Sequence, residues 1–292
     1  MANLIKKIRT SSGDSQIDYN ALANLPTISN PNLLINSDFR NPVNQRGKTT
    51  VSTTVGNWTK NYCIDRWYIQ NGVTANVQNG YIKLTASASS EYGYFCQPLE
   101  QALENATYTI TINAKSVGSG STVYFKSGTS AYGKALVVGI NVITVSMSLS
   151  SVEIQLHPNS TIELYWIKLE RGTTSTAFVP KLYAQEVADC QRYYTKSNGV
   201  RLQVIHGTNH LYITVPLTAA LRTDPNITLG ATQIKVLYDG DGDSKSYNVG
   251  DCYATATNTH VVLDVNGSYG VSVYKIGSVA ESLPIYIDAE LY

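Results

Sequence analysis

The sequence predicts an all-β protein in which two β units follow one another along the chain. Over most of the 292 residues, apolar and polar side chains alternate with a period of two, which is typical of half-buried strands. Clusters of Gly, Ser and Asn separate these runs, as they do in turns between strands. One compact stretch near residue 185 departs from this pattern and has the spacing of a helix. These three observations favour strands in series with one helical link.

The pattern divides the chain into four parts. Residues 1–30 contain too little apolar material for a core of their own, so we expect an extended N-terminal arm that orders against another surface. Residues 31–181 carry many short strands at the spacing of a jelly-roll-like β-sandwich. A short linking helix is expected over 182–196, and a C-terminal β-sandwich tip domain over 197–292.

Individual strands of the first β unit can be assigned from the pattern. The apolar run at 32–39, NLLINSDF, is expected to form a first strand that ends in a turn. At 107–116 every second residue is apolar, so one face of this strand is expected to be buried. At 152–156 the apolar residues alternate with Glu153 and Gln155, which places these two polar side chains on the opposite face.

The stretch at 184–194, AQEVADCQRYY, has the spacing of a helix. Its apolar residues recur at i, i+3 and i+7, with Cys190 and Tyr194 on that face. Asp189 precedes Arg192 by three residues, which predicts an ion pair along the helix. Cys190 has no neighbouring cysteine or histidine to activate it, so we expect it to be a packing residue at a joint between the two β units.

The composition argues against several classes of function. The net charge is +1 and only 15% of the residues are charged, so the chain lacks the electrostatic attraction on which nucleic-acid binding depends. No apolar run is long enough for membrane insertion, and the first residues do not have the pattern of a secretion signal. The four cysteines are far apart, which favours free, buried thiols and leaves a Cys63–Cys96 disulfide open.

Aromatic residues with polar neighbours supply the candidate binding site. The chain has 21 Tyr but only 4 Phe and 3 Trp. Tyr is favoured in strands, so most of these residues are expected to be structural. Sugar binding, however, uses exposed aromatic rings against the apolar sugar face and polar groups for the hydroxyls. Trp67 is expected in the core. The candidates for glycan binding lie in 57–72 and 89–95, and they are Trp58, Tyr62, Tyr92 and Tyr94.

Motifs for catalysis and metal binding are not found in the sequence. It has no nucleophile elbow, zinc-protease, phosphate-loop or dinucleotide motif, so we expect neither an enzyme nor a cofactor. DGDGDS at 239–244 begins like a calcium loop, but Gly250 stands where the twelfth position requires Glu. An acidic turn is preferred, and an ion at Asp239–Asp243 stays open. His206 and His210 flank a turn without a third ligand, so no metal is expected, unless copies meet on an oligomer axis.

Several stretches resemble tail-fibre, or receptor-binding, proteins of phages and prophages. The segment 17–30, IDYNALANLPTISN, is similar to the connector that precedes the sandwich in such proteins. The segment 32–47, NLLINSDFRNPVNQRG, together with YCIDRWYI at 62–69, is similar to the opening of their sandwich. The segment 162–194, IELYWIKLERGTTSTAFVPKLYAQEVADCQRYY, is similar to the hinge before their tip. The resemblance covers the layout of roughly the first two-thirds of the chain, and the region from about 197 resembles no family.

The resemblance implies a non-enzymatic part of a virion, with a carbohydrate-binding-module-like sandwich. Such a protein would be a homotrimer that is attached to a phage baseplate or fibre protein through its N-terminus. It would mediate host attachment by binding a bacterial surface glycan. It would be made in the host cytoplasm and reside in the virion tail. Two alternatives stay open: a lectin or accessory carbohydrate-binding module, and a tail-spike depolymerase that cleaves glycans.

Overall fold

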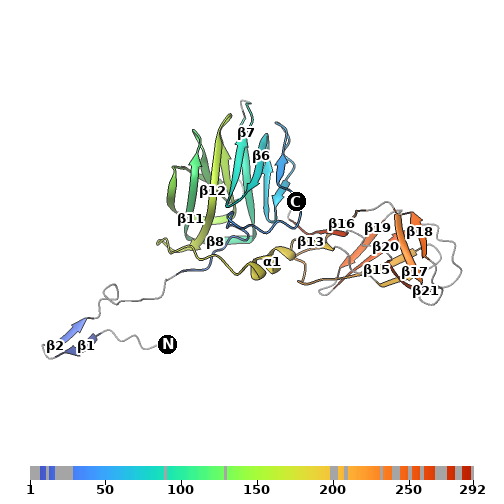
Figure 1. The fold of residues 1–292 in the computed structure, drawn as a ribbon. Coiled ribbons are helices and arrows are strands. Elements are labelled where there is room, and N and C mark those ends of the chain that lie inside the picture. Colours follow the sequence, from blue (N-terminus) through green and yellow to red (C-terminus); the bar gives the residue numbers. More distant parts are fainter. Residues whose placement is uncertain are drawn as a thin grey trace.

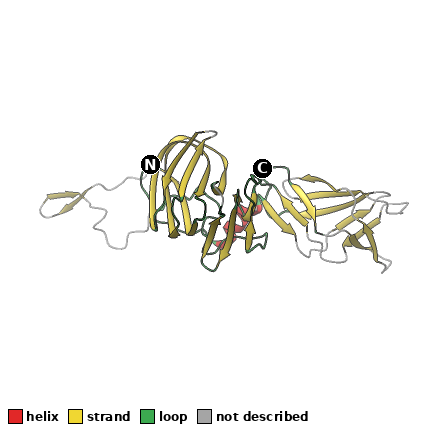
Figure 2. Ribbon diagram, turned by 90° about the horizontal axis from the view of Figure 1, so that it is seen from above, coloured by secondary structure: helices red, strands yellow, loops and turns green. Residues whose placement is uncertain are grey.

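Over the residues that it describes, the computed structural model is all-β with one short helix, which confirms the fold class predicted from the sequence. Figure 1 shows a β-sandwich with the helix α1 (Tyr183–Gln191) at its base, a second β unit to one side and an arm to the other. Figure 2 shows α1 between the sandwich and the C-terminal strands. The structure describes residues 7–10, 13–16, 29–88, 91–127, 130–197, 203–206, 210–230, 233–238, 244–248, 252–256, 260–266, 275–279 and 285–290.

The first β unit is a sandwich of two layers that share two long strands. Its strands are β3 (Thr50–Ser52), β4 (Asn61–Ile64), β5 (Trp67–Gln70), β6 (Val73–Gln78), β7 (Tyr81–Ala86), β8 (Gly93–Val117), β9 (Thr122–Ser127), β10 (Ser130–Ala135), β11 (Gly139–Leu156) and β12 (Thr161–Arg171). The front layer contains β10, β9, the second half of β11, the first half of β8, β5 and β4. The back layer contains the other halves of β11 and β8, followed by β12, β7, β6 and β3. Irregular pairing between Met147 and Ser151 marks where β11 passes from one layer to the other.

The core lies between the two layers and contains the apolar faces that the alternation predicts. From β8 and β12 it takes Ile110, Ile112 and Leu164, all fully buried. Trp67 is also fully buried, as predicted, and stacks on Phe95 with ring centroids 4.6 Å apart. Burial of this apolar surface is the main favourable contribution to the stability of the sandwich.

The outer side of β8 is covered as well. Thr109 and Thr111 alternate with the core residues, yet both are buried, because the segment after β12 folds back over them. The Thr109 hydroxyl donates to the Gly172 carbonyl at 2.7 Å, and the Thr111 hydroxyl lies 2.7 Å from that of Ser175. The alternation identifies the inner face correctly but does not reveal this second cover.

The segment 32–39 is not the strand that the sequence predicts. It consists of bends, and only a single bridge joins Asp38 to Trp166. Asn36 has a positive φ of 55°, which a regular strand does not allow. Its side-chain amide donates to the Val43 and Asp65 carbonyls, and its side-chain oxygen accepts from the Val43 amide. The Asn36 side chain therefore holds this segment together with backbone hydrogen bonds to β12, while its apolar residues still reach the core.

The helix is shorter than the expected linking segment, and its ion pairs differ from the prediction. Cys190 is buried, but Tyr194 begins strand β13 (Tyr194–Ser197) and is not part of the helix. Asp189 does not pair with Arg192. Its carboxylate lies 2.8 Å from the Lys181 ammonium, whereas Arg192 pairs with Glu100 of β8. Arg192 thus connects the helix end to the sandwich.

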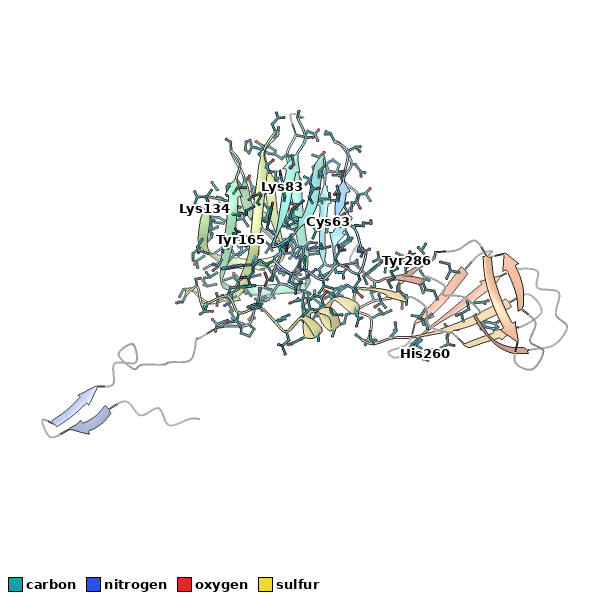
Figure 3. All side chains as sticks on the ribbon, in the orientation of Figure 1. Cys63, Lys83, Lys134, Tyr165, His260 and Tyr286 are labelled. Carbon is teal, nitrogen blue, oxygen red and sulfur yellow. The ribbon has the colours of Figure 1, made fainter. Side chains whose placement is uncertain are left out.

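The C-terminal β unit contains two sheets. A three-stranded sheet pairs β13 and β16 (Asn226–Leu229) with β22 (Ile285–Asp288), which lies in the middle. A seven-stranded sheet follows the order β18, β17, β21, β14, β15, β20, β19. In chain order these strands are β14 (Gln203–His206), β15 (His210–Pro216), β17 (Gln233–Tyr238), β18 (Ser244–Asn248), β19 (Cys252–Ala256), β20 (His260–Asn266) and β21 (Lys275–Val279). Tyr286 of the small sheet lies between the sandwich and the larger sheet (Figure 3).

The arm contains a short hairpin that the sequence does not predict. Strand β1 (Lys7–Thr10) pairs with β2 (Gly13–Gln16). The predicted acidic loop at 239–243 lies outside the described residues. No helix in the described part of the chain is long and apolar enough to cross a membrane.

Candidate functional site

The outer surface of the front layer gathers side chains from strands that are far apart in the sequence. Cross-strand register places Gln70 of β5 opposite Tyr94 of β8, and Tyr94 opposite Gln155 of β11. The next row in register contains Tyr68, Cys96, Glu153 and Tyr124. Residues directly opposite on antiparallel strands have neighbouring side chains on the same face. We call this surface the outer face. It continues to the loops at the end of the sandwich that is far from α1 (Figure 1).

Trp58 and Tyr94 form an exposed aromatic pair on the outer face. Trp58 comes from the loop between β3 and β4, and its side chain is 55% exposed. Its ring centroid lies 5.6 Å from that of Tyr94, at an interplanar angle of 45°. The Trp58 carbonyl accepts a hydrogen bond from Gln70, and the Tyr94 hydroxyl accepts one from Gln155 at 3.1 Å. An apolar ring surface is thus bordered by amide groups, which is the arrangement expected for binding a polyhydroxylated ligand.

Tyr92 and His157 form a second aromatic contact beside the first. Tyr92 is 40% exposed and meets His157 edge-on, with ring centroids 4.7 Å apart. The pairing of Gly93 with Leu156 brings the two residues together. Gly120 lies against His157: a Cβ atom at this position would be 2.2 Å from an imidazole carbon, and φ there is +76°. Both the available space and the backbone conformation therefore require glycine.

A charged pair lies next to the aromatic residues. The Lys126 ammonium is 2.6 Å from a Glu153 carboxylate oxygen, and it lies 5.7 Å from the Tyr94 ring centroid. Burial disfavours the charged form of Lys126, but the hydrogen bond and charge of Glu153 outweigh it and raise the pKa. The pair therefore presents a neutralised, hydrogen-bonding group near the rings, and not a patch of net charge.

Tyr62 differs from the other three candidates because it is buried. Its side chain is 4% exposed and packs edge-on against Tyr68, with centroids 5.5 Å apart. The Arg46 guanidinium lies 4.9 Å from the Tyr62 ring centroid. Burial raises the pKa of the Tyr62 hydroxyl well above its usual value. The structure thus brings Trp58, Tyr92 and Tyr94 to one end of the outer face, whereas Tyr62 is part of the packing near the second β unit.

The candidates predicted from the sequence do not include four polar or aromatic side chains of the outer face. These are Lys126, Glu153, Gln155 and His157. The alternation at 152–156 does place Glu153 and Gln155 away from the core, which is a usable signal. It does not say which residues stand beside them, because that depends on the pairing of β11 with β8 and β9.

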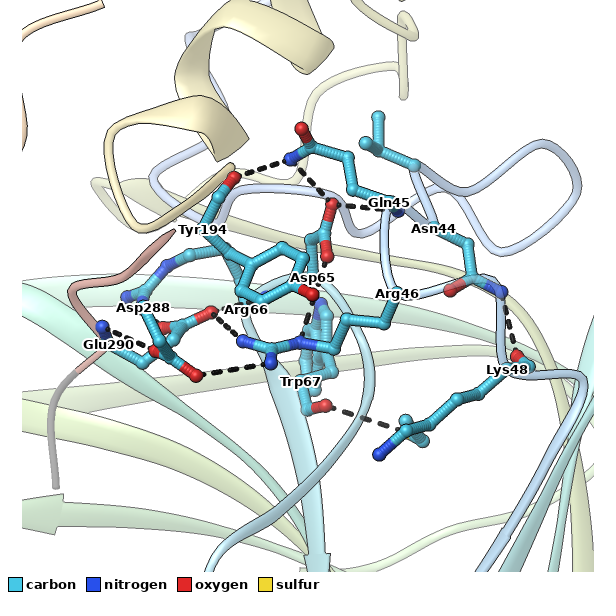
Figure 4. Close-up of polar contacts among 12 residues, drawn as sticks. Asn44, Gln45, Arg46, Lys48, Asp65, Arg66, Trp67, Tyr194, Asp288 and Glu290 are labelled. Carbon is cyan, nitrogen blue, oxygen red and sulfur yellow. Dashed lines mark hydrogen bonds and ion pairs between the residues drawn. The ribbon is translucent and has the colours of Figure 1, made fainter. Parts of the chain in front are cut away.

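A second cluster of polar side chains joins the sandwich to the C-terminal strands. We call it the joint cluster, and it consists of Arg46, Asp65, Arg66, Asp288 and Glu290 (Figure 4). Arg66 Nη1 lies 2.5 Å from Glu290 Oε2, and the Arg66 amide donates to Glu290 Oε1 at 3.1 Å. Arg46 Nη1 lies 3.2 Å from Asp288 Oδ2. The Arg46 guanidinium thus connects one loop of the sandwich to Asp288, the last residue of β22. The Arg66 guanidinium connects another loop to Glu290, which follows β22.

The two tyrosines at the end of the helical stretch stack on these guanidiniums. The Arg66 guanidinium carbon lies 3.6 Å from the Tyr193 ring centroid, and that of Arg46 lies 3.8 Å from the Tyr194 centroid. Such contacts are favourable because the ring face is negatively polarised. The pattern QRYY therefore has a structural role: its tyrosines close the joint cluster from the helix side.

The described cysteines are not suited to nucleophilic chemistry, and the described residues contain no clustered metal ligands. Cys63, Cys96 and Cys190 are free and buried, and burial raises the pKa of the Cys63 thiol to about 12. A thiol with a raised pKa is a poor nucleophile at neutral pH. Among the described residues, no group of three or more His, Cys, Asp or Glu side chains has the arrangement of a metal site.

Comparison with known proteins adds little. No protein-family model matches the chain, and no curated protein matches it. Solved structures that it resembles include discoidin II of Dictyostelium discoideum, which is 10% identical with a TM-score of 0.19, over 73% of this chain and 83% of that one. Vicilin from Corylus avellana, the hazelnut, is 5% identical with a TM-score of 0.17, over 76% and 84% of the two chains. At these scores the likeness carries no argument about fold or function.

Proposed function

We propose that this chain is a carbohydrate-binding protein and that the outer face of its sandwich binds the glycan. The observation that carries the proposal is the exposed pair Trp58 and Tyr94, with Tyr92 beside it and Gln155 within hydrogen-bonding distance of Tyr94. Aromatic rings bind the apolar faces of sugars, and the neighbouring amides and the Lys126–Glu153 pair would bind hydroxyl groups.

The proposal predicts that Trp58→Ala and Tyr92→Ala each weaken glycan binding without unfolding the protein. Losing one aromatic contact costs about 0.5–1.5 kcal/mol, which corresponds to roughly a twofold to thirteenfold increase in Kd. Binding would be measured by calorimetry, with a polysaccharide selected from an array of bacterial surface glycans.

Tyr183→Ala is the matched control for this experiment. Tyr183 is also an exposed aromatic residue, 51% accessible, but it lies at the start of α1 and away from the outer face. Its substitution should leave Kd unchanged. If both Trp58→Ala and Tyr92→Ala bind like the wild type, the sandwich is not the glycan-binding unit, and the C-terminal unit becomes the candidate.

The finer proposal is that the chain is a phage or phage-like tail fibre that attaches the particle to a host cell. Its support is the resemblance of 32–47, 62–69 and 162–194 to such fibres. The protein would be a homotrimer, bound to a baseplate or fibre protein through its N-terminal arm, and located in the virion tail. Three weak sugar sites on one particle would then act together and raise the apparent affinity. Light scattering of the purified protein tests this proposal, because a strict monomer would contradict it.

The alternative functions predict different results in two measurements, the oligomeric state and the release of reducing ends. A lectin or an accessory carbohydrate-binding module would bind glycans through the same outer face without forming a trimer. A tail-spike depolymerase would release new reducing ends from host capsule, whereas we propose that this chain is not an enzyme. Incubation of the protein with capsule, followed by a reducing-end assay, separates these cases.

A further inference from the structure

The joint cluster contains more acidic than basic groups. Two guanidiniums, those of Arg46 and Arg66, face the carboxylates of Asp65, Asp288 and Glu290. Arg66 and Glu290 are almost completely buried, with side-chain exposures of 1% and 0%. If all three carboxylates are ionised, one negative charge is left without a matching cation in a site with little solvent, which is energetically costly.

Asp65 is the carboxylate with the weakest compensation. Its side chain is completely buried. Its Oδ2 atom accepts hydrogen bonds from the Gln45 amide at 3.2 Å and from the Gln45 side chain at 2.9 Å, both neutral donors. Among the described residues no hydrogen-bond donor reaches its Oδ1 atom, and the Arg46 Nε atom is 3.9 Å away. Glu290 and Asp288, by contrast, each have a closer guanidinium nitrogen.

The position of Asp65 connects its charge to the joint. The Gln45 side chain that donates to Asp65 also donates to the Tyr194 carbonyl at 2.7 Å. Arg46, the nearest cation to Asp65, stacks on Tyr194 and pairs with Asp288. Asp65 on the sandwich is therefore linked to Tyr194, just after the helix, through the Gln45 side chain. It is linked to Asp288 of the C-terminal strand through the Arg46 side chain.

We propose that the joint between the sandwich and the C-terminal β unit is controlled by one proton on Asp65. With Asp65 protonated, the joint cluster holds two cations and two anions, and the joint is closed. With Asp65 ionised, the excess negative charge weakens the contacts of Arg46 and Arg66 with Asp288 and Glu290. The C-terminal β unit then separates from the sandwich more often.

The pKa of Asp65 agrees with this proposal. Burial raises it to about 7, although the hydrogen bonds from Gln45 and the charge of Arg46 lower it, and Glu290 raises it further. A pKa raised in the closed state stabilises that state fully below the pKa of the free side chain. This contribution is lost as the pH rises through about 7.

The other ionisable groups around the cluster do not compensate for Asp65. Burial raises the pKa of Tyr62, Cys190, Tyr193 and Tyr194, so these groups stay neutral near pH 7. Arg192 is already paired with Glu100. Lys60 lies over the Tyr68 ring on the outer face, and burial lowers its pKa. Its charge interacts with that of Glu290, whereas the cation that acts on Asp65 is Arg46.

Hydrogen exchange of the Arg66 amide tests the proposal, because this amide donates to Glu290 across the joint. Its exchange rate is divided by the intrinsic rate of an unprotected amide of the same local sequence at the same pH, so that the intrinsic effect of pH cancels. For an opening controlled by a group with the pKa of Asp65, this ratio should rise about tenfold between pH 6 and pH 8.5. A ratio that stays constant in the wild type would overturn the proposal.

Asp65→Asn identifies the group, since asparagine resembles the protonated carboxyl in shape and charge. In this variant the ratio should be independent of pH and should lie below the value that the wild type has at pH 6, where part of the stabilisation is already lost. A rise like that of the wild type would show that another group is responsible. Asp288→Asn is the second variant if Asp65→Asn does not fold. It also leaves two carboxylates for two guanidiniums, which lowers the pKa of Asp65, so the rise should shift to lower pH or disappear. Asp38→Asn, at a carboxylate paired with Arg40 on the surface, should behave like the wild type.

Discussion

At the scale of single residues, Gly120 shows how the outer face depends on a position without a side chain. Its backbone occupies the left-handed region, and His157 fills the space that a Cβ atom would need. His157 in turn supports Tyr92, one of the candidates for glycan binding. A residue without a side chain therefore positions one of the candidate binding residues.

We expect Gly120→Ala to destabilise the sandwich by about 1–3 kcal/mol and also to displace Tyr92. Gly80→Ala is the matched control: Gly80 has φ +89°, but its Cβ would meet no atom within 4 Å. It should show the backbone strain alone, and therefore the smaller loss. Urea unfolding of both variants measures the difference, and equal losses would show that crowding against His157 has no cost.

Residue-scale predictions from the sequence were correct where burial follows from a local period. The burial of Trp67 and of alternate residues in β8 follows from the pattern of their own strands. The burial of Tyr62 does not, because it depends on Tyr68 and on Arg46, which comes from a different loop. The ion pair between Asp189 and Arg192 that helix spacing suggests does not form, for the same reason. Asp189 pairs with Lys181, and Arg192 pairs with Glu100, which lies far away in the sequence.

At the scale of elements, the segment 32–39 shows that an apolar run alone does not establish a strand. Its composition suits a strand, but Asn36 adopts a positive φ and binds Val43 and Asp65 with its side chain. The segment shares backbone hydrogen bonds with β12 at Leu33, Ser37 and Phe39, and the Asn36 side chain adds bonds to the backbone of two loops. An asparagine within an apolar run is a signal for such a bend, although the partners cannot be found without the fold.

Asn36→Gly tests this role, because glycine keeps the backbone conformation and removes only the three side-chain hydrogen bonds. We expect a loss of about 2–4 kcal/mol, since the buried Val43 and Asp65 backbone groups lose their partners. Asn159→Gly is the control at another positive-φ asparagine, which is exposed, and it should change the stability by less than about 0.5 kcal/mol. A small loss for Asn36→Gly would mean that the apolar contacts and the backbone hydrogen bonds to β12 are enough to hold the segment. Thermal or urea unfolding provides the measurement.

At the scale of the whole molecule, two β units in series could be predicted from the sequence, but the contact between them could not. Arg66 and Glu290 are separated by 224 positions, and no periodicity relates them. The charged residues of YCIDRWYI, Asp65 and Arg66, belong to a joint with the C-terminal strand, which no local pattern indicates. The candidate site was predicted in part: its aromatic residues stand out by composition, but their polar neighbours come from register.

Breaking the buried ion pair of the joint should be costly. Arg66→Met leaves Glu290 buried without its closest cation, and we expect a loss of about 3–5 kcal/mol. The double variant Arg66→Met/Glu290→Gln removes both charges and should recover at least half of this loss. Arg40→Met is the control, because the Arg40–Asp38 pair is partly exposed and worth at most about 1 kcal/mol. A double variant as unstable as Arg66→Met would show that packing on Tyr193, and not charge, is what Arg66 contributes.

The two strands shared between the layers of the sandwich have a consequence for the cooperativity of unfolding. In β8 and β11 one continuous pairing runs from Ala114 and Gly139 in the back layer to Gly93 and Leu156 in the front layer. Neither layer can lose its part of this pairing without freeing a strand that the other layer needs. The sandwich is therefore a single cooperative unit, and its two sheets are not independent modules that happen to be stacked.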